Sequence, residues 1–360
     1  MSSAILALPW SDCLVPAATP PAEMVASVRR ALGVVPNWLD RLAPCPWLVR
    51  GFTLFPGKPW AYAPPELWDL IILVVSQDNS CRYCYGVQRS LMRIHGYDEA
   101  TLARLERDVS TAELPPSTRT ALDFARKLSR ADPRPGTPDY ATLQRVGLDG
   151  PAAAEIAFAV ASASFSNRAS TLLSLPPATD LETLVGWRLF RVLRPLLAWR
   201  LRRERPHAAP LAIPNAGFGA RLVAALGDSP SATPLRHVLD EALASDILPR
   251  RTKMMLFAVI AKALRCAATE SEARAALLAE GVSAETIDDV LLHLGSPQLD
   301  SREAVLVPFA RDTVRYQYAE IQRRTREVTA GMKPAELLEL VGIVALANAV
   351  CRLSTLLDVC

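Results

Sequence analysis

The sequence has almost no excess of charge of either sign. Its 40 Lys and Arg residues face 37 Asp and Glu residues, which leaves a formal net charge of +3 at pH 7. A chain so close to balance lacks the strong basic field that attracts polyanions. We therefore expect neither nucleic acid nor a membrane surface as its partner.

We expect neither a secretory signal peptide nor a membrane-spanning segment in this sequence. The stretch 1–8 is apolar, but it is short and has no basic region, unlike a signal peptide. No apolar run free of charge approaches the length that spans a bilayer. The seven cysteines are an odd number without the spacing of a disulfide-rich secreted domain. We therefore expect a soluble protein in the reducing cytoplasm.

The alternation of apolar and polar residues that marks β-strands is missing. Helical patterns occupy 21–31, 116–130 and 151–173 instead. The proline-rich stretch 44–65 predicts short helices and turns, which we expect to lie over the candidate site described next. The fold class is therefore predicted to be all-α.

The residues that carry chemistry are concentrated in the stretch 66–96. An apolar run at 67–75 is followed by a polar break at 77–80 and by a second helical run that opens with Cys81 and Cys84. The break supplies helix-capping residues, so Cys81 is expected in the first helical turn with Asn79 or Ser80 as the cap.

Two cysteines three positions apart lie on one face of a helix. The N–H groups and the dipole at a helix N-terminus favour a thiolate, which lowers a cysteine pKa and makes the sulfur nucleophilic. One sulfur can then be attacked and the other can resolve the product. Cys81 and Cys84 are therefore a candidate dithiol/disulfide redox pair.

A carboxylate accompanies this pair. Asp69 lies twelve positions before Cys81, inside an apolar run. Burying a charged side chain costs free energy unless it has partners, so the presence of Asp69 there suggests a function. It leads into the same turn as the cysteines and is a candidate proton acceptor or relay.

An acid followed by S-x-x-N-x-C-x-Y-C before an amphipathic helix resembles the AhpD-like alkylhydroperoxidase branch of the carboxymuconolactone decarboxylase superfamily. The stretch 33–37, Gly-Val-Val-Pro-Asn, resembles the same family's G-x-V-P-N segment. The family pattern is Glu-x11-Cys-x2-Cys-x3-His, and the matching positions here are Asp69, Cys81, Cys84 and Gln88.

The resemblance implies a peroxide-reducing dithiol site. Cys84 would attack the peroxide and form a sulfenic acid, and Cys81 would condense with it to a disulfide. An external dithiol protein would then reduce this disulfide, and no bound cofactor or metal is implied.

Two positions depart from the family pattern. Asp69 in place of Glu keeps the carboxylate but shortens its reach by one methylene group. Gln88 in place of His removes a group that titrates near neutral pH and leaves a hydrogen-bonding amide. Tyr83, Asp69 or His95 are alternatives for the proton relay that this histidine would provide.

His95 is three turns from Cys84, about 16 Å along the helix, and is expected at the helix C-terminus before Gly96.

The second half of the chain repeats the first. At a shift of 185 positions Cys81 falls on Cys266, and Phe-Ala-Arg at 124–126 recurs at 309–311. At a shift of 184, Arg-x-Ser-Thr-Leu-Leu at 168–173 recurs at 352–357. We interpret this as a tandem duplication of an AhpD-like helical bundle.

The second copy has lost most of the chemistry. Asp69, Cys84 and Gln88 become Met254, Thr269 and Ala273. Cys266 remains without a second thiol at close spacing, and Cys351 and Cys360 are expected to be inert. We therefore predict an active repeat at 1–178, a degenerate repeat at 213–360, and a homodimer or homotrimer, because single-repeat relatives are oligomeric.

Between the repeats, 179–212 is predicted to be a basic connector helix followed by a linker. Arg188, Arg191 and Arg194 recur every three residues, and Pro195 should bend the helix. A solvated arginine face is the favoured interpretation.

Three alternatives remain open for the cysteine pair and the function. The thiols could be structural, or two of four zinc ligands, although a second pair is absent. The chain could act on a small organic substrate as a tailoring or decarboxylase-like enzyme. It could also be a non-catalytic redox sensor.

Overall fold

The computed structural model describes residues 4–57, 60–107, 113–187, 190, 192, 194–196, 198 and 216–358. Within these ranges the chain forms α-helices, short 3-10 helices and turns, and no strand is present. The predicted all-α fold class is therefore confirmed.

The elements follow one another along the chain with short connections. The helices are α1 Ala22–Leu32, α2 Leu39–Leu42, α3 Pro46–Leu54, α4 Pro65–Asp78, α5 Arg82–His95, α6 Glu99–Arg107, α7 Pro116–Arg130, α8 Thr137–Arg145, α9 Gly150–Leu173, α10 Thr179–Gly186, α12 Ala220–Ala225, α13 Ala232–Ala244, α14 Arg250–Ala263, α15 Ala267–Ala279, α16 Ala284–His293, α17 Glu303–Asp312, α18 Tyr318–Val328 and α19 Pro334–Leu353. The 3-10 helices are η1 Ala4–Ala7, η2 Phe55–Gly57 and η4 Ser354–Asp358.

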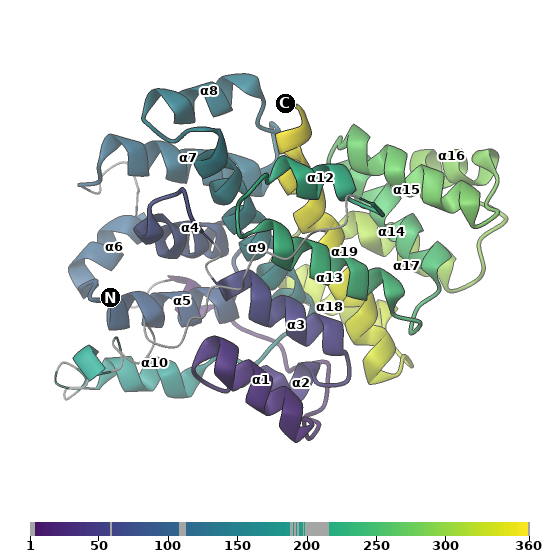
Figure 1. Cartoon of the computed structure of the whole chain (residues 1–360). Coiled ribbons are helices and arrows are strands. Elements are labelled where there is room, and N and C mark those ends of the chain that lie inside the picture. The colour runs from purple at the N-terminus through teal and green to yellow at the C-terminus, as the bar shows by residue number, and fades with distance from the viewer. Residues whose placement is uncertain are drawn as a thin grey trace.

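Two long buried helices, α9 and α19, pack against each other at the centre of the molecule (Figure 1). Asp149 starts α9 because its carboxylate accepts the N–H of Ala152 at 3.1 Å, and proline follows in the first turn. Ala and Ser dominate α9, so neighbouring helices can approach its backbone closely. Apolar residues cover all sides of both helices, as expected for helices enclosed on every face.

The remaining helices surround this central pair. Helices α4, α5, α7 and α8 pack on α9, whereas α13 and α14 pack on α19. Helices α4, α5 and α6 begin 185 positions before α14, α15 and α16, and α9 begins 184 positions before α19. This order matches the sequence repeat. The duplication and its boundaries at 178 and 213 stay predictions.

Two buried arginines connect the halves. Arg168 on α9 donates to the main-chain oxygens of Thr313 at 3.2 Å and Val314 at 3.0 Å, just after α17 ends. Arg352 on α19 donates to the main-chain oxygen of Ser129 at 2.7 Å, near the end of α7. Helix C-terminal carbonyls carry partial negative charge, so each long helix stabilises the end of a helix in the opposite half. Burial lowers the pKa of both guanidinium groups.

Two buried carboxylates make further cross-links. Glu155 on α9 accepts the N–H groups of residues 61–63 at 2.7 to 2.8 Å and the Ser229 hydroxyl at 2.8 Å. Glu339 on α19 binds the Trp47 indole and, at 2.5 Å, the ammonium group of Lys253. Each carboxylate thus joins segments from both halves and has the partners that a buried charge requires.

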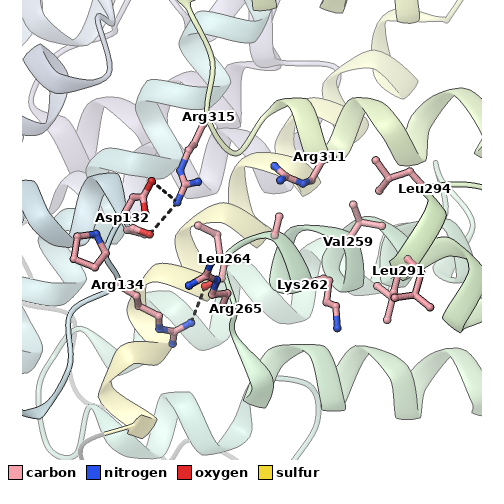
Figure 2. A pocket seen from close by; sticks show the side chains of 14 residues that line it. Asp132, Arg134, Val259, Lys262, Leu264, Arg265, Leu291, Leu294, Arg311 and Arg315 are labelled. Atoms are coloured by element: carbon pink, nitrogen blue, oxygen red, sulfur yellow. Dashed lines mark hydrogen bonds and ion pairs between the residues drawn. The ribbon is translucent and has the colours of Figure 1, made fainter.

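A cavity of about 580 Å³ lies where the ends of α7, α14, α16 and α17 meet (Figure 2). The basic side chains that line it are Arg134, Lys262, Arg265, Arg311 and Arg315. Arg315 pairs with Asp132 at 3.3 Å, and Arg134 donates to the main-chain oxygen of Leu264 at 3.3 Å. Some of these cations therefore stabilise helix ends and loops around the cavity.

The connector region is described only in part. Its first segment is α10, and the predicted arginine positions 188, 191 and 200–205 lie outside the described residues.

The stretch Pro334–Asp358 is long and apolar enough to cross a membrane by length and composition, yet 94 % of its most apolar window is buried inside the protein.

Gly342 on α19 provides a test of the packing between the halves. A Cβ atom there would lie 2.5 Å from the ring of Trp47, which its bond to Glu339 holds in place. Gly342→Ala is therefore expected to lower the free energy of unfolding by about 1 to 3 kcal/mol, although alanine is the better helix former. Urea unfolding would measure the change.

Gly150→Ala is the matched control. Gly150 also lies in a long central helix, but a Cβ atom there has no neighbour within 4 Å. Its free energy of unfolding should change by no more than about 0.5 kcal/mol. Equal effects of the two substitutions would contradict the packing described.

Candidate active site

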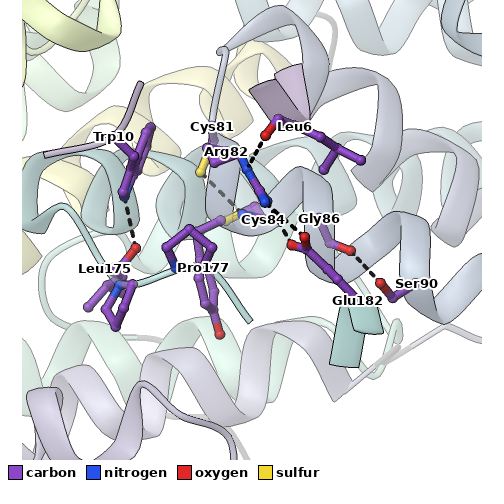
Figure 3. A network of polar contacts seen from close by, with 12 residues as sticks. Leu6, Trp10, Cys81, Arg82, Cys84, Gly86, Ser90, Leu175, Pro177 and Glu182 are labelled. Atoms are coloured by element: carbon purple, nitrogen blue, oxygen red, sulfur yellow. Dashed lines mark hydrogen bonds and ion pairs between the residues drawn. The ribbon is translucent and has the colours of Figure 1, made fainter. Parts of the chain in front are cut away.

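The candidate site is formed at the turn between α4 and α5. Helix α4 continues through Asp78, so the break is shorter than the predicted 77–80. Ser80 has a positive φ of 49°, and Cys81 follows as the N-cap of α5. The expectation that Asn79 or Ser80 caps a helix containing Cys81 is therefore wrong. The Cys81 sulfur is itself the cap and accepts the N–H of Cys84 at 3.4 Å (Figure 3).

The two thiols have different environments. Cys81 is fully buried, and burial together with the hydrogen bond to Cys84 raises its pKa well above the ordinary value. Burial also acts to raise the pKa of Cys84, but hydrogen bonds from Cys81, Ser170 and Asn167 outweigh it and lower that pKa. Cys84 is therefore the better thiolate of the pair, and Cys81 is the thiol that supports it.

The residues of α9 that support Cys84 are held in a polar network. Ser170 lies 3.5 Å from the Cys84 sulfur. Asn167 accepts a hydrogen bond from the Asn79 side chain at 3.1 Å and donates one to the Ser76 hydroxyl at 3.1 Å. These contacts fix the orientation of the Asn167 amide beneath the thiol. The polar break in the sequence therefore positions the group that stabilises the thiolate.

Asp69 lies near the start of α4 and faces the far end of α5. One carboxylate oxygen accepts the Gln88 amide at 3.1 Å, and the other contacts Nδ1 of His95 at 2.7 Å. Asp69 and Gln88 are buried, and His95 is nearly so. The three side chains form a hydrogen-bonded acid, amide and imidazole cluster.

His95 is one of the three alternatives that the sequence offers for the proton relay, and its distance from Cys84 does not indicate a contact with Asp69. It is the last residue of α5 before Gly96, as predicted, and three turns from Cys84. A tight turn makes α4 and α5 antiparallel, so the start of α4 meets the end of α5. Positions 84, 88, 91 and 95 also recur on one helical face. The antiparallel turn and the shared helical face together explain why His95 meets Asp69.

Tyr83 lies on the wall of the site. Its hydroxyl donates to Oδ1 of Asn37 at 3.2 Å, and burial raises its pKa, so it stays neutral. Asn37 in turn donates to the main-chain oxygen of Pro176 at 3.1 Å. Tyr83 therefore joins α5 to the G-x-V-P-N segment, and Asn37 joins that segment to the chain just after α9.

A cavity of about 430 Å³ contains Cys84, Asp69, Gln88, His95 and Tyr83 in its wall. The rest of its lining is mainly apolar and includes Leu32, Trp38, Phe52, Trp68, Ile72, Val87 and Leu91. Val34 and Val35 also line it and are 49 % and 42 % exposed, which places them at its rim. The thiol and the acid–imidazole pair thus share one apolar pocket.

An ion pair holds the outer side of α5 (Figure 3). Arg82 makes two contacts with Glu182 of α10, at 2.7 and 2.8 Å, and donates to the main-chain oxygen of Leu6 at 2.9 Å. Gly86 leaves the space for Glu182, because a Cβ atom would lie 2.2 Å from that carboxylate. The N-terminal segment and α10 therefore cover the helix that carries Cys84.

Within the described ranges, no group of three or more His, Cys, Asp or Glu side chains is placed to hold a metal ion. The six described cysteines are all free thiols.

No protein-family profile matches the chain, and no curated protein matches it. A search of solved structures finds similarity to an uncharacterised peroxidase-related protein from Ralstonia eutropha JMP134, described as an alkylhydroperoxidase AhpD core. The match has 25 % identity and a TM-score of 0.43, and it covers 49 % of this chain and 96 % of that one. Because this similarity is weak, the function has to be inferred from the geometry of the site.

The hydrogen bonds to Cys84 generate a prediction about thiol reactivity. Ser170→Ala and Asn167→Leu each remove a hydrogen bond that stabilises the thiolate, so the pKa of Cys84 should rise. A hydrogen bond to a charged group contributes about 1.5 kcal/mol or more, which corresponds to roughly tenfold slower alkylation at neutral pH. Iodoacetamide labelling across pH, followed by peptide mass mapping, measures the rate at Cys84.

Ser90→Ala is the control. Ser90 is a buried serine of α5 whose hydroxyl donates to the main-chain oxygen of Gly86 at 2.8 Å, away from the thiols. It should leave the labelling profile unchanged. Faster labelling of Cys81 than of Cys84 in the unsubstituted chain would contradict the assignment.

Proposed function

We propose that this protein is a thiol-dependent hydroperoxidase or a closely related dithiol oxidoreductase. The observation that carries the proposal is the position of Cys84. A thiol with a lowered pKa lies in the wall of an apolar cavity, directly above a second thiol, and an acid–imidazole pair lies in the same cavity. Reactive cysteines have lowered pKa values and reachable sulfurs, and Cys84 has both.

The first step is attack by the Cys84 thiolate on one peroxide oxygen. The O–O bond breaks, Cys84 becomes a sulfenic acid, and the released alkoxide takes a proton to become an alcohol. The apolar lining supports an organic hydroperoxide as the preferred substrate over hydrogen peroxide, because an apolar group can fill the cavity.

The second step is attack by Cys81 on the sulfenic acid. A disulfide forms and water leaves, and an external dithiol protein returns the pair to two thiols. Cys81 is fully buried, whereas Cys84 lines the cavity, so the reductant would attack the disulfide at Cys84. The Cys81 sulfur accepts the N–H of Cys84 at 3.4 Å, which keeps the two residues together at the start of α5.

Asp69 and His95 are proposed to store and deliver the proton. His95 lies about three turns from Cys84 along α5, whereas Gln88 lies one turn away and bonds to Asp69. Gln88 therefore orients the carboxylate, and His95 supplies the imidazole that the family pattern has at position 88. Water in the cavity would carry the proton to the alkoxide.

A second candidate function follows from the same pair. A carboxylate and an imidazole 2.7 Å apart in an apolar pocket can remove a proton from a small organic substrate without any thiol. Such a tailoring or decarboxylase-like reaction would persist in Cys84→Ser, which separates it from the peroxidase.

Consumption of cumene hydroperoxide by the reduced protein, with dithiothreitol as the reductant, tests the proposal. We expect multiple turnovers in the unsubstituted chain and none in Cys84→Ser, because serine cannot form the sulfenic acid. Cys81→Ser should form the sulfenic acid once and then turn over slowly. Failure of the unsubstituted protein, with its thiols verified as free, would refute peroxidase activity, and a single stoichiometric oxidation would identify a sensor.

His95→Gln tests the proton relay. Glutamine can still bond to Asp69 but does not titrate near neutral pH, so kcat/KM should fall by roughly 10²-fold or more. Iodoacetamide labelling of Cys84 should stay unchanged, which distinguishes loss of the relay from damage to the thiol. Arg93→Gln changes a half-exposed residue of the same helix turn and is the control. Unchanged turnover in His95→Gln would remove His95 from the mechanism.

A further inference from the structure

A second thiol cluster lies in the C-terminal half. Cys266 is the N-cap of α15, and its sulfur hydrogen-bonds the hydroxyls of Thr269 at 3.1 Å and Ser354 at 2.7 Å. The same Ser354 hydroxyl lies 2.9 Å from the main-chain oxygen of Cys351, on α19, so one serine contacts both cysteine residues. Spacing along the chain gives Cys266 no partner, but the fold brings Cys351 to it. Both thiols are buried.

This cluster corresponds position by position to the site at Cys84. The shift of 185 places Cys81 on Cys266 and Cys84 on Thr269, and the shift of 184 places Ser170 on Ser354 and Asn167 on Cys351. Each half thus has a cysteine at the N-cap of the corresponding helix and a serine from the C-terminal end of its long central helix, with Ser170 inside α9 and Ser354 directly after α19. The second thiol has moved from the capped helix to the central helix.

The pKa values of Cys266 and Cys351 are shifted in opposite directions. Hydrogen bonding from Cys351, supported by Ser354, Thr269 and the charge of Arg134, lowers the pKa of Cys266 to about 5 against the effect of burial. Burial and the neighbouring Cys266 raise the pKa of Cys351 well above its ordinary value. Cys266 is therefore the nucleophile of the pair and Cys351 the proton-bearing partner.

The basic cavity between the halves lies beside this pair. Arg134 lines the cavity, and its guanidinium also contacts the Ser354 hydroxyl at 3.5 Å. Leu264 and Arg265, which line the cavity too, immediately precede Cys266. Arg134 pairs with Asp358 at 2.9 Å, and that aspartate is 45 % exposed. Arg134 therefore links the lining of the cavity to the serine whose hydroxyl bonds to the Cys266 sulfur.

We propose that Cys266 and Cys351 form a second redox-active dithiol site, which a small hydroperoxide oxidises to a disulfide between α15 and α19. The Cys266 thiolate attacks the peroxide, the O–O bond breaks, and the leaving alkoxide takes a proton to give an alcohol and a sulfenic acid. The Cys351 sulfur then displaces the hydroxyl group, which leaves with the Cys351 proton as water. Two electrons pass from the two sulfurs to the peroxide.

The double variant Cys81→Ser/Cys84→Ser isolates this site in the full chain and leaves five of the seven cysteines. The reduced variant is treated with a few equivalents of hydrogen peroxide, alkylated under denaturing conditions and mapped by mass spectrometry. We expect the loss of two thiols per chain and a peptide cross-link between Cys266 and Cys351. Adding Cys351→Ser should abolish the cross-link, and adding Cys13→Ser, a half-buried cysteine elsewhere, should not.

A second measurement follows the Cys266 thiolate. The same double variant should show ultraviolet thiolate absorbance at neutral pH that disappears as the pH falls through about 5. Adding Cys266→Ser should remove this absorbance. The unsubstituted chain, mapped after the same peroxide treatment, must contain the same cross-link, which guards against a variant that fails to fold.

Two results would overturn the proposal. Cys266 and Cys351 could both remain free in the double variant after the same treatment with hydrogen peroxide, which would make them inert structural thiols. Cys266 could instead be oxidised to a sulfinic acid while Cys351 stays reduced. Both readouts are independent of turnover at Cys84, so failure of the peroxidase function and failure of the second site are distinguishable.

Discussion

The structure depends on the packing of α9 against α19 and on the buried arginines that these helices carry. Arg168 and Arg352 each donate to main-chain oxygens near helix ends in the opposite half. A buried guanidinium without hydrogen-bond partners would cost several kcal/mol, so these contacts fix how the halves meet. The buried carboxylates Glu155 and Glu339 also join the two halves. A buried carboxylate without hydrogen-bond or ion-pair partners costs free energy, so these contacts favour one arrangement of the helices.

This arrangement places a small polar cluster against the start of one helix in each half. In the N-terminal half the central helix brings Ser170 and Asn167 to Cys84. In the C-terminal half the end of the central helix brings Cys351 and the following Ser354 to Cys266. In both places hydrogen bonds from the central helix outweigh burial and favour a thiolate. Thiol chemistry in this protein is thus controlled by contacts between helices more than by the helix that holds the nucleophile.

The two halves differ in what surrounds the sulfur. Cys84 lies in an apolar cavity with Asp69 and His95, which suits an uncharged organic substrate and proton delivery. Cys266 lies beneath a basic cavity without an equivalent acid–imidazole pair, since Met254 and Ala273 occupy the positions of Asp69 and Gln88. The same backbone arrangement therefore surrounds one cysteine with an apolar cavity and an acid–imidazole pair, and places the other beside a basic cavity.

The all-α class and the helices at 116–130 and 151–173 could be predicted from the sequence alone, because helical periodicity is a local property. The grouping of Asp69, Cys81, Cys84 and Gln88 is an expectation from the resemblance of their spacing to a family pattern. The cap at Cys81, the bond between His95 and Asp69, and the meeting of Cys351 with Cys266 could not be predicted from the sequence. Each depends on the antiparallel course of α4 and α5 or on the packing of α19, and spacing along a chain contains no information about which distant helices meet. Tertiary structure therefore decided which thiols have partners and which histidine joins the acid.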